Sequence, residues 1–302
     1  MASIEILPRG PFSLAAAQSF AGGFPAGIGG GGVGPGSITL AFPVEGFDAS
    51  AAVELWQDPD GTVRGRSDAE GEVLGRATVQ AARSLSLDHD GSGWPSVGER
   101  DEVLGRAQRE HDFLRPVCFY SAYEAATSFV IGQRISRRQS AVIKRELAEQ
   151  LGDRPTIEGV EVAAFPRPVR LLELRSARGL NDEKVRRLHG LAQAALDGRL
   201  DTERLRAMPE PEALAALREL PGVGPFTADG ILYRGCGVVD GLPGSDELGQ
   251  SVIRDLYGRP SVTAADVERL AEAWRPYRMW AVVLLRMAWT RAQAGDVSYR
   301  RA

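Results

Sequence analysis

The chain has 302 residues, of which 43% are hydrophobic and 25% charged, an ordinary composition for a globular protein of two or three domains. No stretch approaches the roughly 20 consecutive apolar residues of a membrane span, and the N-terminus lacks a signal peptide's basic region and apolar core. Two cysteines, Cys118 and Cys236, fit buried free thiols in a reducing cytoplasm. We therefore expect neither a membrane-spanning helix nor a secreted domain held together by disulfides.

The net charge of −4 is distributed unevenly along the chain. Residues 1–112 contain 8 basic and 16 acidic side chains, whereas residues 113–302 contain 28 basic and 24 acidic ones. Because local charge decides phosphate binding, the acidic total does not exclude DNA as a partner of the second part.

The first third of the chain predicts a small α+β domain. The expected strands lie at residues 4–7, 38–42, 52–57 and 62–66, with helices at 12–20 and 76–87 and a glycine-rich loop at 22–36. The turn residues Asp58-Pro59-Asp60-Gly61 indicate a hairpin between the last two strands. We therefore expect an antiparallel sheet with one or two helices, ending near residue 112.

The rest of the chain, residues 113–302, has the apolar spacing of helices. Helices are expected at residues 121–130, 137–151, 171–174, 182–196, 263–274 and 276–291, and on both sides of a turn at 220–225. Asn181 and Thr263 are expected N-caps. The predicted fold class is thus α+β, with a sheet domain at 1–112 and a two-lobed helical core whose lobes cover about 118–230 and about 231–302.

The turn Leu220-Pro221-Gly222-Val223-Gly224 joins two helices too tightly for large side chains. Gly222 and Gly224 can adopt backbone angles that other residues avoid, and they leave backbone N–H groups uncovered. N–H groups at the start of a helix form a favourable site for a phosphate oxygen.

This turn resembles the hairpin of the helix-hairpin-helix DNA glycosylase superfamily. The resemblance extends over roughly residues 113–295 and is strongest with the 3-methyladenine DNA glycosylase II family. It is carried by the hairpin and by four further motifs: Tyr123-x-x-Ala126, Ile131-Gly132-Gln133-x-x-Ser136, Lys184-x-x-x-Leu188 and Trp274-Arg275-Pro276-Tyr277-Arg278.

In that family a Gly/Pro-rich loop after the hairpin ends in a catalytic aspartate, and here Asp246 takes that place. A carboxylate there stabilises the positive charge that develops on the sugar when the glycosidic bond breaks. Asp246 could instead be an ordinary N-cap, and Asp240 is a competing carboxylate. Asp229 lies in the second hairpin helix, where a structural bond is expected.

Relatives that also cut the DNA backbone carry a lysine two residues after the second hairpin glycine, where its amine forms a Schiff base. Phe226 occupies that position, and the chain contains only two lysines, Lys144 and Lys184. The resemblance therefore implies a monofunctional glycosylase that uses water as its nucleophile.

The resemblance also implies DNA contacts in two segments. They are the hairpin residues Gly222, Val223, Gly224 and Thr227 and the loop residues Gln133, Arg134, Ile135 and Ser136. Arg134 is the favoured intercalating or strand-contacting side chain, since a base inside the duplex must be flipped out to be cleaved. Arg137 and Arg138 either contact phosphates or lie on a solvated face.

The family binds cationic alkylated bases against aromatic rings. The candidate base-pocket residues are Phe226, Tyr123, Trp280, Phe20 and Arg286. Arg286 departs from the family, which often has a tryptophan at this position, and a cation there would repel a cationic base. Either the preferred lesion differs or Arg286 points away; Trp289, one turn on, could compensate.

No cofactor is expected. His89, His111 and His189 are isolated and lack metal-ligand spacing, although the backbone carbonyls of Leu220 and Val223 could hold a structural monovalent cation, as in relatives.

The expected activity is hydrolytic release of alkylated bases, of the 3-methyladenine and 7-methylguanine type, from double-stranded damaged DNA by a monomer in the cytoplasm, associated with the nucleoid. The alternatives are a glycosylase for an oxidised or deaminated base, or a non-catalytic protein that binds damaged DNA.

Overall fold

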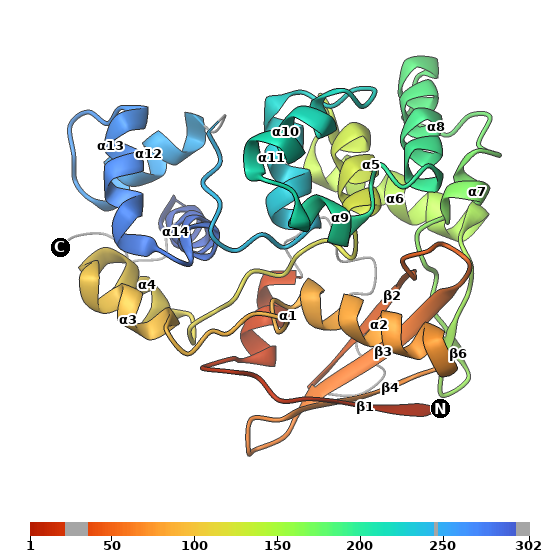
Figure 1. Ribbon diagram of the computed structural model, residues 1–302, viewed down its shortest axis with the longest axis horizontal. Helices are drawn as coiled ribbons and strands as arrows, with labels where there is room; N and C mark the ends of the chain where they lie inside the picture. Colours follow the sequence, from red (N-terminus) through yellow and green to blue (C-terminus); the bar gives the residue numbers. More distant parts are fainter. Residues whose placement is uncertain (22–35, 245–246, 294–302) are drawn as a thin grey trace.

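The computed structural model describes residues 1–21, 36–244 and 247–293, and the predicted glycine-rich loop lies almost wholly outside these ranges. Figure 1 shows a sheet layer below two groups of helices, one formed by the middle of the chain and one mainly by its C-terminal part. Each of the three bodies has its own hydrophobic core.

The sheet layer is formed by four antiparallel strands in the order β1-β4-β3-β2. The strands are β1 (Ala2–Ile6), β2 (Ser37–Pro43), β3 (Ser50–Gln57) and β4 (Val63–Ser67). The helices α1 (Leu14–Ala21) and α2 (Gly71–Ser84) accompany the sheet. Fully buried side chains such as Phe42, Val53 and Leu55 fill the core of this layer. The α+β fold class with an N-terminal antiparallel sheet is confirmed.

The middle of the chain forms a helical lobe around its own core. Its elements are α5 (Ala122–Gly132), α6 (Arg137–Leu151), the short strands β5 (Thr156–Ile157) and β6 (Val160–Glu161), α7 (Pro168–Leu171), α8 (Asp182–Leu196), α9 (Thr202–Ala207), α10 (Glu210–Arg218), α11 (Pro225–Gly230) and the π-helical segment η1 (Ile231–Gly235). Ser136 and Asn181 cap α6 and α8, because their side chains accept hydrogen bonds from the backbone N–H groups three residues ahead.

The second lobe contains α12 (Glu247–Leu256), α13 (Ala264–Ala271), the 3-10 turn η2 (Glu272–Trp274) and α14 (Arg278–Gln293). Two helices from the first third of the chain, α3 (Trp94–Arg100) and α4 (Glu102–Glu110), complete its core. Trp94 packs edge-on against Trp280 of α14, with ring centroids 5.6 Å apart. The core of this lobe therefore contains residues from both sides of position 112.

Phe20, near the end of α1, is partly buried where the three cores meet, since it packs against all of them. The Phe20 side chain, which belongs to the sheet layer, thus lies between the two helical lobes. No helix among the described residues is long and apolar enough to cross a membrane.

Candidate active site

The hairpin brings α10 and α11 together as the sequence predicts. The amide of Val223 donates a 3.1 Å hydrogen bond to the Leu220 carbonyl, and Gly222 has a φ of +78°, which favours glycine. Gly224 differs from the expectation, because its φ of −93° and ψ of −178° are open to any residue. A Cβ added at Gly224 would also meet nothing within 4 Å. The fold itself therefore does not require this glycine.

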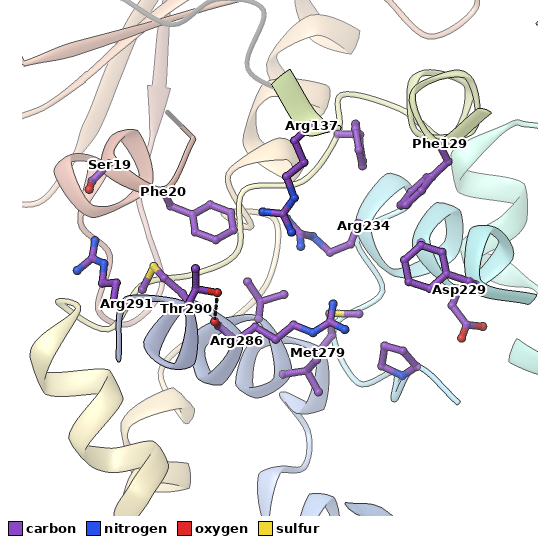
Figure 2. A pocket seen from close by; sticks show the side chains of 17 residues that line it. Ser19, Phe20, Phe129, Arg137, Asp229, Arg234, Met279, Arg286, Thr290 and Arg291 are labelled. Atoms are coloured by element: carbon purple, nitrogen blue, oxygen red, sulfur yellow. Dashed lines mark hydrogen bonds between the residues drawn. The ribbon is translucent and has the colours of Figure 1, made fainter. Parts of the chain in front are cut away.

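A cavity of about 460 Å³ opens beside the hairpin, between α11 and α14. Its walls come from α1, the segment before α5, α5, the first turn of α6, α11, η1 and α14, and Figure 2 shows the side chains that line it. The volume lies within the range of small-molecule sites. It is large enough for one extruded nucleobase.

One wall of the cavity is aromatic and is formed by Phe226 of the second hairpin helix together with Phe129 of α5. Phe226 lines the cavity with 54% of its surface exposed, and its ring meets Phe129 of α5 edge-on at 5.9 Å between centroids. Gly230 permits this approach, because a Cβ there would lie 2.2 Å from the Phe129 ring. Phe226, Gly230 and Arg234 are spaced four residues apart, so they share one helix face, and all three line the cavity. This spacing could have identified Arg234 from the sequence.

Arginines form a second part of the lining. Arg286 of α14 points into the cavity, together with Arg234 and the first residue of α6, Arg137 (Figure 2). Burial, followed by repulsion from the nearby Arg234 and Arg137, lowers the pKa of the Arg286 guanidinium to about 10. Arg286 thus lines this cavity rather than pointing away from it.

The structure brings three of the five predicted pocket residues to the cavity: Phe20, Phe226 and Arg286. Tyr123 is fully buried in the first helical lobe, where its hydroxyl donates to the Pro166 carbonyl at 2.9 Å. Trp280 is buried in the core of the second lobe. Neither lines the cavity.

Most of the remaining lining is apolar and is not among the predicted site residues. Phe119, Met279, Val282, Val283 and Met287 contribute, and on the outer side Ser19, Thr290 and Arg291. Trp289 lies outside this lining, and its indole N–H donates to Asp255 at 2.8 Å.

The loop between α5 and α6 is held against the hairpin by Gln133. Its side-chain amide donates to the Gly222 carbonyl at 2.8 Å, and its side-chain oxygen accepts from Arg187 at 2.9 Å. The neighbouring Arg134 is exposed and has a φ of +58°, which is strained for a residue with a side chain. The side chain of Gln133 thus fixes the loop against the hairpin and α8, whereas the side chain of Arg134 is exposed to solvent.

The other predicted DNA-binding residues have structural roles as well. Ile135 packs against the core of the first lobe, and Ser136 caps α6. The side chains of Val223 and Thr227 are buried. Arg138 is exposed on α6.

The predicted catalytic residue, Asp246, lies outside the described residues. Pro243, three positions before it, lines the cavity. Of the competing carboxylates, Asp240 is engaged by Arg275 at 2.7 Å and by Arg278 at 2.9 Å. Asp229 is buried in α11 and lines the cavity.

Neither lysine lines the cavity. The Lys144 amine forms a buried ion pair with Glu124 at 3.2 Å, and the Lys184 amine donates to the carbonyls of Ile131 and Gln133. Within the described ranges no three His, Cys, Asp or Glu side chains are grouped as metal ligands would be. Cys118 and Cys236 are buried free thiols.

We compared the sequence and the fold with those of known proteins. No protein-family model matches the chain. DNA-3-methyladenine glycosylase 2 of Escherichia coli (strain K12) is 29% identical over 191 residues, which cover 60% of this chain and 62% of the relative. The chain therefore spans less than two thirds of that relative's length.

Two solved structures share the fold. The 3-methyladenine DNA-glycosylase from Archaeoglobus fulgidus superposes with a TM-score of 0.76 at 20% identity, over 94% of this chain and 97% of that one. An 8-oxoguanine glycosylase/lyase from Clostridium acetobutylicum gives a TM-score of 0.68 at 18% identity, over 94% and 95%. The chain thus has the fold of the helix-hairpin-helix DNA glycosylases. In sequence it resembles the 3-methyladenine DNA glycosylase II family.

Proposed function

We propose that the protein is a DNA glycosylase that hydrolyses the N-glycosidic bond of a damaged base flipped out of double-stranded DNA. The observation that carries this function is the juxtaposition of a base-sized cavity with the hairpin. Phe226 belongs to the second hairpin helix and forms a cavity wall, two residues after the exposed Gly224. A strand held by the hairpin backbone would present its extruded nucleotide to this cavity.

Asp246 is the proposed catalytic carboxylate. When the base leaves, positive charge develops on the sugar, and a fixed carboxylate stabilises it. At about 4 Å and an effective dielectric constant near 20, one such charge pair contributes about 4 kcal/mol, or roughly a thousandfold in rate. A water molecule oriented by the same carboxylate completes hydrolysis.

The proposed reaction is monofunctional. An enzyme that cuts the backbone needs an amine at the sugar, and Phe226 occupies the position where such a lysine would lie. The amines of Lys144 and Lys184 are both engaged elsewhere, as described above. Water is therefore the proposed nucleophile.

The DNA-facing residues are proposed to form two DNA clamps, one at the hairpin turn with Gly222 and Gly224 and one at the loop between α5 and α6 with Arg134. The hairpin backbone at Gly222 and Gly224 contacts phosphates, and Arg134 enters the space that the extruded base leaves. We propose that a structural monovalent cation binds at the hairpin, since the Leu220 carbonyl accepts one hydrogen bond within the turn and a carbonyl oxygen has two acceptor sites. Such an ion, held with the Val223 carbonyl, would stiffen the turn and take no part in the chemistry.

Alkylated bases of the 3-methyladenine and 7-methylguanine type are the first candidates for the substrate, on the names of the similar proteins. An oxidised or deaminated base is the second candidate, and it is favoured by one observation, the arginines in the cavity lining. The proposed partner is double-stranded damaged DNA, bound by a monomer in the cytoplasm.

Base release from methylated duplex DNA, wild type against Asp246→Asn, tests the function. Asparagine caps a helix as well as aspartate does, so the exchange removes the charge and leaves a capping role intact. We expect a loss of roughly a thousandfold in single-turnover rate.

Asp201→Asn is the matched control, because Asp201 caps α9 by accepting from the Arg204 amide at 2.7 Å. Equal rates for wild type and Asp246→Asn would remove Asp246 from its role. A loss seen only in Asp229→Asn would transfer the role to the other cavity carboxylate. Binding of damaged duplexes without any turnover would establish a non-catalytic protein.

A further inference from the structure

The cavity concentrates positive charge at the place where the proposed function puts the damaged base. Arg137, Arg234 and Arg286 enter it from α6, η1 and α14, three elements far apart in the sequence (Figure 2). Arg291 adds a fourth guanidinium, whereas Asp229 supplies one carboxylate among the described lining residues and the proposed catalytic Asp246 would supply a second. A base in this space would therefore be surrounded by more cationic than anionic groups.

The charges act on one another. The lowered pKa of Arg286, about 10, has burial as its first cause, followed by repulsion from Arg234 and then from Arg137. At neutral pH Arg286 remains protonated, because this pKa lies well above 7. A second cation in the same space would meet that repulsion again.

One aromatic ring of the cavity already has a cation beside it. The Arg234 guanidinium lies 5.7 Å from the centroid of the Phe20 ring. The cation–π interaction of the Phe20 ring is thus formed with Arg234 of the protein itself rather than with a bound base. The guanidinium groups of the lining would repel a positively charged base. A wall of aromatic rings alone would attract such a base through cation–π interactions.

A neutral, oxygen-rich base matches the same lining. A guanidinium is a planar fork of N–H donors that pairs with the oxygen and nitrogen acceptors of a purine edge. Oxidised and deaminated purines carry carbonyl oxygens and no fixed charge. Such a base can stack on Phe226 and accept hydrogen bonds from Arg286.

On the proposed function, we infer that this cavity selects uncharged damaged bases with exposed carbonyl oxygens over bases with a fixed positive charge, and that Arg286 is the residue that sets the choice. The substrate class is therefore narrower than for a cavity lined by aromatic rings alone. Arg137 and Arg234 strengthen the selection by keeping the cavity cationic.

The test compares single-lesion duplexes that contain 7-methylguanine, which is cationic, with duplexes that contain hypoxanthine or 8-oxoguanine, which are neutral. Single-turnover base release is measured for wild type and for Arg286→Met and Arg286→Lys. Affinity is measured in parallel on duplexes whose damaged nucleotide carries a 2′-fluoro group, which blocks cleavage. Arg145→Met is the control, since Arg145 is exposed on α6 and does not line the cavity.

Arg286→Met should shift the ratio of neutral to cationic base release toward 7-methylguanine by roughly 100-fold, because like charges brought together in a site cost several kcal/mol. Arg286→Lys should keep the rejection of 7-methylguanine, since the charge remains, and should lose release of the neutral bases, since the fork is gone. Arg145→Met should leave the ratio unchanged.

If wild type released 7-methylguanine best and Arg286→Met left the ratio unchanged, the selection would be refuted and the glycosylase function would stand. If wild type released no base from any duplex, the proposed function would fail, and the selection with it.

Discussion

The side-chain amide of Gln133 donates a 2.8 Å hydrogen bond to the carbonyl oxygen of Gly222. This bond joins the turn after α5 to the turn of the hairpin, two loops 89 residues apart. Arg187 of α8 completes the link by donating to the Gln133 side-chain oxygen at 2.9 Å. The two proposed DNA clamps are thus held in a fixed relation before any DNA binds.

Gln133→Ala should therefore lower both stability and DNA affinity. Loss of two hydrogen bonds, one of them to a charged donor, should lower the free energy of unfolding by about 2 kcal/mol. The dissociation constant for damaged duplex should rise because the two loops no longer hold one another. Urea unfolding and a binding titration measure both effects. Gln193→Ala, in the exposed part of α8, should change neither, and an unaffected affinity in Gln133→Ala would show that the link is not used.

Gly224→Ala separates the requirements of the fold from those of DNA. The backbone at Gly224 suits alanine, and a Cβ there meets no neighbouring atom, so the fold should be as stable as before or more stable by up to about 1 kcal/mol. If a phosphate approaches this backbone closely, the new methyl group should weaken DNA binding by about tenfold or more. Thermal melting and the salt dependence of binding report the two effects. Gly75→Ala in α2 should give a similar gain in stability with no change in affinity; a normal affinity in Gly224→Ala would remove the hairpin from the interface.

Arg134→Gly should leave the fold intact while reducing base release. Arg134 is held at a φ of +58°, a conformation that costs of order 1 kcal/mol for a non-glycine residue and that glycine adopts without strain. The melting temperature should stay level or rise, whereas release of a base that must first be flipped should fall. A damaged base that has no partner on the opposite strand costs less free energy to flip out. The loss of base release in Arg134→Gly should therefore be smaller on a duplex that contains such an unpaired base. Equal activity of variant and wild type on fully paired duplex would contradict a role of Arg134 in base extrusion.

Strand cleavage should be absent from the reaction. With Phe226 in the lyase position, the product duplex should keep its backbone until it is treated with hot alkali. Borohydride should trap no covalent protein–DNA adduct, since no Schiff base forms. Electrophoresis of the untreated and alkali-treated products checks both points. A trapped adduct that disappears in Lys184→Ala would assign an amine to the chemistry and overturn the monofunctional reaction.

Local signals in the sequence predicted the long helices well, because α6 and α8 carry both an amphipathic pattern and a capping residue. The helices α3 and α4 escaped prediction for a physical reason. They cross where a Cβ on Gly105 would lie 2.4 Å from the Gly98 carbonyl, so the glycines that suggest a loop are there to permit close packing. The cavity could be predicted only in part. The hairpin motif predicts Phe226, and the four-residue spacing from Phe226 indicates Arg234. Arg137 of α6 and Arg286 of α14 join them only through tertiary packing, which no single stretch of sequence encodes.

A buried ion pair beneath the cavity wall offers a prediction that is independent of DNA. The Glu124 carboxylate and the Lys144 amine are almost completely buried and lie 3.2 Å apart, with the Lys144 amine 5.5 Å from the centroid of the cavity-lining Phe119. Burial raises the pKa of Glu124 and lowers the pKa of Lys144, and the attraction between them opposes both shifts. Lys144→Met should lower the free energy of unfolding by about 3–5 kcal/mol, because it leaves a buried carboxylate alone. The double variant Glu124→Gln/Lys144→Met should recover much of this loss.

The deficit of Lys144→Met should also depend on pH. Without the amine, burial remains the largest influence on Glu124 and keeps its pKa in the folded state above the value in the unfolded chain, against the smaller lowering by the Tyr120 backbone hydrogen bond. Such a group stabilises the fold below its unfolded pKa, and this contribution is lost as the pH rises through the folded pKa. The deficit of Lys144→Met should therefore shrink from about pH 8 to about pH 5, while the double variant, which carries no titrating group here, should follow the wild type. Urea unfolding at the two pH values measures it, and a deficit that stayed constant would mean that Glu124 gains another charged partner when Lys144 is removed.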